Sequence, residues 1–270
     1  MINVVIFPTN NFRRIKMPIE YEKEGHVATF TINNPEVMNA LTPTQVAEWT
    51  DALIDFRDDK NLWVGIVTGA GEKAFCTGLN LRSAGQTAGG EARPIPQETL
   101  VRGLKLYKPL IAAINGYALG GGLEISLACD IRIASENAQL GLTEVTLGLL
   151  PGWGGTQRLP RLVPFGVAAE MMIMGRRVKA DEALAIGLVH EVVPLENLME
   201  TAKARAEKIA ESAPLAVQGV KEAMLRGIEM TLADGLALES ELGRRVNSSK
   251  DFAEGMKAFA EKRKPNYTGE

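Results

Sequence analysis

The 270-residue chain contains little cysteine and little histidine, with two residues of each. Its cysteines, Cys76 and Cys129, are far apart in sequence, and no CxxC motif or Cys/His cluster occurs. This scarcity argues against a disulfide framework and against a zinc site. We interpret both cysteines as small core residues beside strands, and their free thiols indicate a reducing compartment such as the cytoplasm.

Long apolar runs and blocks of one charge are missing as well. The longest apolar stretches, such as GIVTGA and PLIAAING, are too short to span a bilayer. The net charge is −3, with both signs interspersed, so no basic patch favours nucleic acid or an anionic membrane. In the N-terminal segment MINVVIFPTNNFRRIK the basic residues follow the apolar part, which is the reverse of a signal peptide.

Three common motifs of nucleotide and hydrolase sites are also missing. GAGEK lacks the GxxxxGK[ST] pattern of a P-loop, and no GxGxxG follows a predicted strand. No GxSxG elbow occurs, and two histidines supply a Ser-His-Asp triad poorly. Any catalytic site must therefore be built from other groups.

The apolar fraction of 46% is sufficient for one large α/β body. HVATFTINNP, at residues 26–35, alternates apolar and polar residues and predicts a strand. Residues 62–71 and 108–118 are nearly continuous apolar runs that predict strands buried on both faces. Thr42 and Pro43 predict the start of an amphipathic helix, since threonine caps helices and proline fits their first position.

The pattern changes along the chain and predicts three regions. Residues 1–16 lack regular periodicity beyond NVVIF and are interpreted as an N-terminal extension, which is either poorly ordered or an artefact of start-site choice. Residues 17–194 form the α/β body, and residues 195–270 carry helical patterns only. A stretch rich in glycine and proline, residues 83–97, predicts a surface loop inside the body.

The segment YALGGGLEISLACDI places three glycines, Gly120 to Gly122, between a predicted strand and a helical run. Gly78 lies in a similar turn after the strand at residues 62–71. Glycines let a backbone approach a ligand closely, and the free amides of a helix N-terminus favour negative charge. Two such segments that converge would form an oxyanion hole. The alternative is a pair of ordinary strand–helix turns.

Two glutamates lie in apolar surroundings. Glu124 follows the glycine triplet by one helical turn, and Glu144 lies in LGLTEVTLGLLPG. Carboxyl groups in apolar surroundings can acquire raised and separated pKa values, which suits general acid–base catalysis. The alternative for each glutamate is a solvated or ion-paired side chain.

Several motifs in the same order resemble the crotonase (enoyl-CoA hydratase/isomerase) superfamily, from about residue 19 to the C-terminus. They are NNPEVMNAL, KAFCTGLNL, IAAINGYALGGGLEISLACDIRIAS, GLTEVTLGLLPGWGGTQRLPRLV and FAEKRKP. The resemblance implies an α/β fold, a spiral of ββα units with two near-perpendicular sheets and a C-terminal helical region that trimerises. It further implies acyl-CoA thioester substrates, a homotrimer or dimer of trimers, and no metal or redox cofactor.

The resemblance also assigns roles to particular residues. The amides of Leu79 and Gly121 would form the oxyanion hole, and Glu124 and Glu144 would flank the α and β carbons of the substrate. Gly152 matches a backbone position that helps to hold the catalytic water. The implied contacts with CoA are Lys73, Ala74, Phe75, Thr77, Leu79 and Arg82, together with Phe259 and Lys262 at the adenine end, often from a neighbouring subunit.

Three residues depart from the family pattern. Asn80 replaces the usual aspartate, Thr77 stands where alanine is common, and Trp153 replaces a smaller residue. Trp153 either restricts the acyl pocket or belongs to the core.

The retained pair of glutamates favours hydration of trans-2-enoyl-CoA, or the reverse dehydration. An enoyl-CoA isomerase and a carnitinyl-CoA-type dehydratase are the alternatives within the superfamily. The alternative from another class is a relative that binds acyl-CoA or RNA without catalysis. The acidic net charge argues against RNA binding, and the intact glycines and both acids argue against a protein that only binds.

Overall fold

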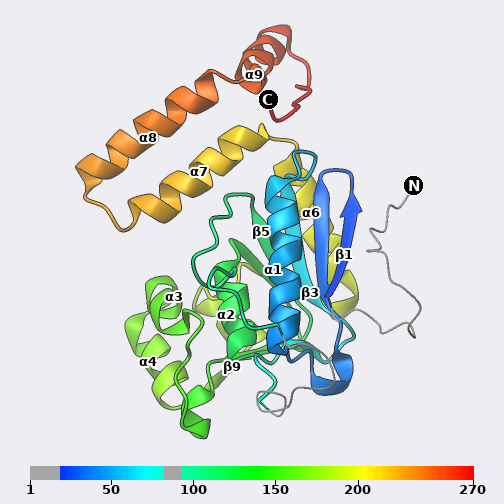
Figure 1. Cartoon of the computed structure of the whole chain (residues 1–270), viewed down its shortest axis with the longest axis vertical. Helices are drawn as coiled ribbons and strands as arrows, with labels where there is room; N and C mark the ends of the chain where they lie inside the picture. Colours follow the sequence, from blue (N-terminus) through cyan, green and yellow to red (C-terminus); the bar gives the residue numbers. More distant parts are fainter. Residues whose placement is uncertain (1–18, 82–92) are drawn as a thin grey trace.

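The computed structural model describes residues 19–81 and 93–270 (Figure 1). Three predicted features lie wholly or partly outside these ranges: the extension at residues 1–16, the CoA contact Arg82, and residues 83–92 of the surface loop.

A six-stranded sheet forms the centre of the body, in the order β1-β2-β3-β5-β7-β10. β1 and β2 are antiparallel, and the following neighbours are parallel. All residues of β3 and β5 are buried, which confirms the two predicted buried strands. The strands are β1 (Ile19–Glu24), β2 (Val27–Ile32), β3 (Val64–Gly69), β5 (Leu110–Ile114), β7 (Ile131–Ser135) and β10 (Glu191–Val193).

A second sheet of four short strands has the order β4-β6-β8-β9. The chain passes from the large sheet to the small one three times, from β3 to β4, from β5 to β6 and from β7 to β8. This alternation confirms the predicted α/β fold with two sheets. The strands are β4 (Ala74–Cys76), β6 (Tyr117–Leu119), β8 (Gln139–Gly141) and β9 (Arg177–Lys179).

Helix α1 (Pro43–Asp58) begins where its capping signal predicts. The Gln45 amide donates to the Thr42 hydroxyl, and the Gln45 side chain accepts from the Thr42 amide, which completes a capping box. Trp49, Leu53 and Phe56 lie on the buried face of the helix, as their spacing predicts. The start, the length and the face of α1 are therefore encoded locally.

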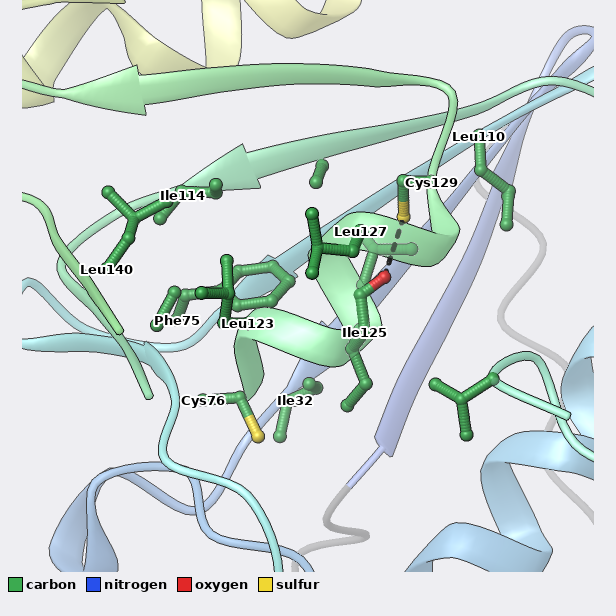
Figure 2. Packing of buried hydrophobic residues seen from close by; sticks show 14 of the residues in the cluster. Ile32, Phe75, Cys76, Leu110, Ile114, Leu123, Ile125, Leu127, Cys129 and Leu140 are labelled. Carbon is green, nitrogen blue, oxygen red and sulfur yellow. Dashed lines mark hydrogen bonds between the residues drawn. The ribbon is translucent and has the colours of Figure 1, made fainter. Parts of the chain in front are cut away.

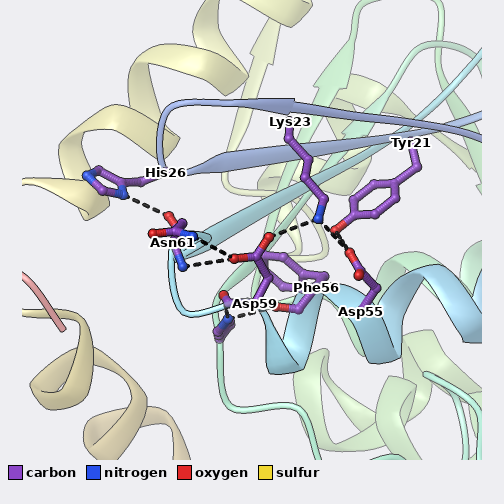
Figure 3. A network of polar contacts seen from close by, with 8 residues as sticks. Tyr21, Lys23, His26, Asp55, Phe56, Asp59 and Asn61 are labelled. Carbon is purple, nitrogen blue, oxygen red and sulfur yellow. Dashed lines mark hydrogen bonds and ion pairs between the residues drawn. The ribbon is translucent and has the colours of Figure 1, made fainter. Parts of the chain in front are cut away.

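Polar contacts join the C-terminal turns of α1 to β1 (Figure 3). Lys23 lies between two carboxylates of α1 and its C-terminal cap, at 2.7 Å from Asp55 and 2.8 Å from Asp59. The Tyr21 hydroxyl donates to Asp55 at 2.8 Å. Because these groups are partly exposed, each ion pair contributes only about 0.2–1 kcal/mol. The network therefore adds little to the stability of the protein.

Helix α2 (Gly121–Ala128) lies inside the body, and buried side chains surround it (Figure 2). Leu123 and Ile125 of this helix are fully buried. Cys129 follows the helix and donates its thiol to the Ile125 carbonyl at 3.5 Å. Cys76 is buried as well, which confirms both cysteines as core residues, and burial raises the pKa of each thiol to about 12.

Helix α6 (Leu198–Ala210) covers the face of the large sheet opposite to α1. Leu198, Ala202 and Ala206 are buried in a cluster with residues of β3 and β5, as their spacing predicts. The division of the chain at residue 195 stays a prediction. Within the described chain no helix has the length and apolarity needed to cross a membrane.

The last three helices extend away from the body (Figure 1). They are α7 (Pro214–Gly227), α8 (Leu232–Asn247) and α9 (Lys250–Glu261). Many of their large apolar side chains are exposed in the single chain, among them Val220, Met224, Ile228, Leu232, Leu236, Met256 and Phe259. The remaining helices are η1 (Pro35–Val37), η2 (Glu144–Leu147), α3 (Gly155–Leu162), α4 (Phe165–Ile173), α5 (Ala180–Ala185) and η3 (Leu195–Asn197).

Candidate active site

The start of α2 presents a backbone amide toward a cavity. Strand β6 ends at Leu119, and the next residue, Gly120, is the N-cap of α2, with a φ of 54° and a ψ of −127° that favour glycine. The Gly120 amide donates to the Gly141 carbonyl at 2.9 Å, and this bond ties the turn to β8. The next amide, that of Gly121, is the first of the helix and has no intrahelical acceptor.

A second amide lies beside the first. Leu41 pairs with the backbone on both sides of Leu79, because its amide donates to the Gly78 carbonyl and its carbonyl accepts from the Asn80 amide, both at 2.8 Å. This pairing leaves the amide of Leu79 itself unused. A methyl group on Gly78, where φ is 88°, would lie 2.8 Å from the Gly121 nitrogen. Within residues 19–81 and 93–270, neither the Leu79 nor the Gly121 amide has a protein acceptor.

Glu124 lies one turn into α2 and is only 2% exposed. Its Oε1 accepts hydrogen bonds from the amides of Trp153 and Gly155, both at 2.7 Å. Burial raises the pKa of this carboxyl to about 7, although the two amides and the Arg158 charge oppose the rise; the nearby Glu144 adds to it. A carboxyl with this pKa exchanges protons readily near neutral pH.

Glu144 begins η2 and faces the turn that precedes α2. Its Oε1 would lie 3.1 Å from a methyl group on Gly120. Its Oε2 is buried without a hydrogen-bond partner in the described part of the chain, and burial raises the pKa of the group. Because an unpaired buried carboxylate oxygen is unfavourable, this group is suited to exchange a proton with a ligand.

One cavity of about 220 Å³ brings these groups together. Its lining contains all five predicted catalytic residues: Leu79, Gly121, Glu124, Glu144 and Gly152. Four apolar side chains complete much of the wall: Leu81, Leu147, Leu149 and Leu150. A neighbouring cavity of about 570 Å³ shares the lining residues Thr77, Leu79 and Leu81 and also contains Arg177. The two cavities therefore meet at Leu79, which carries one of the two amide donors.

The predicted CoA contacts are distributed unevenly. Thr77 lines both cavities, and Lys73 is exposed just before β4. The side chains of Ala74 and Phe75 are buried in the core, so their contacts with a ligand would come from the backbone.

Phe259 lies in α9, and Lys262 caps this helix at its C-terminal end. Phe259 is 84% exposed. In Figure 1, α9 lies at the end of the molecule opposite to α3 and α4. A single chain thus does not bring these two residues to the cavity.

Sequence reasoning missed the amides of Trp153 and Gly155 as partners of Glu124. Gly155 is buried, and a methyl group on it would lie 3.0 Å from the Glu124 carboxylate. It also missed Arg158, whose guanidinium donates to the carbonyls of Trp153 at 3.1 Å and Val101 at 2.9 Å. The glycines of PGWGG were the available signal, because they mark a backbone that approaches another group closely.

The departures from the family pattern can now be located. Asn80 lines the larger cavity, and Thr77 donates its hydroxyl to the Met38 carbonyl at 3.1 Å. Trp153 lines the smaller cavity and also packs against the main core. Both interpretations of Trp153 therefore describe part of its environment.

The arrangement combines two amide donors for a developing oxygen charge with two carboxyl groups for proton transfer. In the described residues no three His, Cys, Asp or Glu side chains form a group that could hold a metal ion. These groups are of the kind that acid–base chemistry on a substrate with a polarised carbonyl group requires.

A model of the enoyl-CoA hydratase/isomerase family matches residues 22–270. The chain therefore belongs to this family, and the resemblance to the crotonase superfamily is confirmed. It is 46% identical over 246 residues to the short-chain-enoyl-CoA hydratase of Clostridium acetobutylicum, covering 90% of this chain and 94% of that protein. It is 44% identical over 255 residues to the (E)-benzylidenesuccinyl-CoA hydratase of Thauera aromatica, covering 94% of this chain and all of that protein.

A solved structure supports the fold as well. The crystal structure of an enoyl-CoA hydratase from Bacillus anthracis superimposes with a TM-score of 0.87 at 45% identity. The match covers 94% of this chain and 100% of that chain. The predicted crotonase fold is thus confirmed.

Proposed function

We propose that the protein hydrates trans-2-enoyl-CoA thioesters to 3-hydroxyacyl-CoA and catalyses the reverse dehydration. The observation that carries this proposal is the cavity lined by two amide-bearing turns, the buried carboxyl of Glu124 and the half-buried carboxyl of Glu144. Hydratase relatives at 44–46% identity support the same reaction.

In the proposed mechanism the thioester oxygen accepts hydrogen bonds from the amides of Leu79 and Gly121. These amides stabilise the negative charge that develops on the oxygen when water adds to the β-carbon. The electron pair of the double bond then resides in an enolate, which collapses as the α-carbon takes a proton. No cofactor enters this sequence, because the thioester itself stabilises the charge.

The two glutamates divide the proton transfers. Glu124 takes a proton from the water while the water oxygen bonds to the β-carbon, and Glu144 supplies a proton to the α-carbon. The reaction requires one carboxyl ionised and one protonated. Burial raises the pKa of both carboxyls, and the charge of Glu144 adds to the rise at Glu124, so double ionisation of the pair is disfavoured. Gly152 contributes a backbone group beside the water.

Isomerisation and binding without catalysis are separated from hydration by their products. The protein should be incubated with crotonyl-CoA and, separately, with a 3-enoyl-CoA, and the thioesters should be identified by mass spectrometry and chromatography. Hydration gives 3-hydroxybutyryl-CoA with a gain of one water. A pure isomerase converts a 3-enoyl-CoA to a product of unchanged mass. A protein that only binds leaves both substrates unchanged, although a titration shows that it binds a CoA thioester.

We further propose that the chain assembles as a trimer or a dimer of trimers. The exposed apolar side chains of α7, α8 and α9 support this assembly, because surfaces of this kind are usually covered. In such an assembly Phe259 and Lys262 reach the adenine end of CoA in a neighbouring subunit, while Lys73 and Arg82 bind its phosphates. Light scattering after size-exclusion chromatography tests this proposal, and a monomer at micromolar concentration would contradict it.

The cytoplasm is the proposed location, since both cysteines are free and buried.

A further inference from the structure

The indole of Trp153 lies directly against the backbone that carries the Gly121 amide donor. A methyl group on Gly121 would lie 2.8 Å from Cε3 and 2.9 Å from Cζ3 of this ring. The ring shares its cavity with Glu124 and Glu144. A large, flat side chain therefore occupies the space next to the groups that act on the α and β carbons.

The segment that carries Trp153 is anchored at three points. The preceding carbonyl, that of Gly152, accepts from Arg102 at 2.8 Å. The Trp153 amide donates to Glu124 at 2.7 Å, and the Trp153 carbonyl accepts from Arg158 at 3.1 Å. The hydrogen bonds hold the backbone of Trp153 in place, and the packing of its ring against the main core opposes rotation of the indole out of the cavity. The ring therefore forms one wall of the cavity.

The two cavities suggest how a thioester divides between them. The larger cavity, of about 570 Å³, adjoins the smaller at Leu79. With the thioester oxygen at Leu79, the long CoA arm enters the larger space and the acyl chain enters the smaller one. A volume of about 220 Å³ is small for a ligand pocket, since pockets for drug-sized ligands span about 300–1,000 Å³.

We infer that Trp153 sets the upper limit on acyl-chain length and restricts the enzyme to short 2-enoyl groups of crotonyl size. This inference rests on the proposed hydratase function and extends it to substrate class. The indole acts by exclusion: each methylene beyond a short chain meets the ring or must displace it. Trp153 is thus a specificity-determining side chain, whereas its amide positions Glu124.

The test compares the wild type with Trp153→Phe and Trp153→Ala, and with Trp63→Phe as a matched control. Trp63 lies in the cluster beneath α6, outside the cavity. Values of kcat/KM are measured for trans-2-butenoyl-, hexenoyl-, octenoyl- and decenoyl-CoA. We expect the wild type and Trp63→Phe to prefer butenoyl-CoA. We expect Trp153→Ala to raise the octenoyl-to-butenoyl ratio at least about 10-fold, because one methylene in an apolar pocket is worth about 10–200-fold.

A binding measurement keeps this inference separate from the proposed function. Butyryl-CoA and octanoyl-CoA are saturated thioesters, which the enzyme cannot hydrate, and their Kd values are measured by calorimetry. We expect Trp153→Ala to strengthen the binding of octanoyl-CoA relative to the binding of butyryl-CoA. If the alanine variant does not fold, Trp153→Phe is used, with the same expected direction. An unchanged ratio in a folded Trp153 variant overturns the inference even when hydration is confirmed. Absence of turnover in every variant overturns the hydratase function instead, and the binding ratio then decides the role of Trp153.

Discussion

The buried carboxyl of Glu124 makes the stability of the protein depend on pH, and this dependence can be calculated. Its pKa rises from the ordinary value of 4.5 to about 7 in the folded protein, chiefly because burial disfavours the charged form. Between these two values the folded protein binds more protons than the unfolded chain. The free energy of unfolding therefore falls as the pH rises through this window.

The size of this effect follows from the pKa difference. At about 1.36 kcal/mol per pKa unit, ionisation of Glu124 costs the folded protein about 3 kcal/mol by pH 8. Glu124→Gln removes the charge, and its amide oxygen can still accept from the two amides that hold Oε1. As the pH rises from 4.5 to 8, the free energy of unfolding of the variant should therefore increase by about 3 kcal/mol relative to that of the wild type.

Urea unfolding at pH 4.5, 6 and 8, at one fixed protein concentration, measures this difference. Glu136→Gln is the matched control, because Glu136 is an exposed glutamate in the turn before β8. We expect the control to follow the wild type at each pH. A constant difference between Glu124→Gln and the wild type over this range would refute the argument that burial of an ionisable group dominates at position 124.

Two further predictions concern the backbone. Gly121→Ala should lower kcat/KM about 10²–10³-fold, because its methyl group meets the Trp153 ring at 2.8 Å and displaces the amide donor. Steady-state assays test this prediction, with Gly166→Ala as the control, because a methyl group on Gly166 has open space around it. Near wild-type activity of Gly121→Ala would contradict the prediction. Thr42→Ala should cost about 1 kcal/mol of stability through loss of the α1 cap, with kcat unchanged; urea unfolding that shows no loss would contradict the capping argument.

Local rules predicted much of the fold. The cap and buried face of α1, the buried strands β3 and β5, and the apolar face of α6 follow from residue spacing alone. The order of motifs then identified the family. The association of the strands into two sheets did not follow from spacing, because it depends on pairing between segments that are distant in sequence.

The sequence predicted candidate residues for the site but not the contacts between them. The glycines before α2 and the isolated acids indicated Gly121, Glu124 and Glu144, and the cavity contains all three. The hydrogen bonds from Trp153 and Gly155 to Glu124 could not be foreseen, since they join α2 to the residues at the start of α3, 29 and 31 positions away in sequence. Whether the Trp153 ring faces the core or the cavity also depends on tertiary packing, and sequence alone left both possibilities open.

The most direct test of the central claim is hydration of crotonyl-CoA by the wild type, Glu124→Gln and Glu144→Gln, with Glu136→Gln as control. The account predicts that the wild type and the control are active. It also predicts that each active-site variant loses at least about 10²-fold in kcat, the usual contribution of a positioned acid or base. An inactive wild type on every enoyl-CoA chain length, or near-full hydratase activity of Glu124→Gln, would contradict the account.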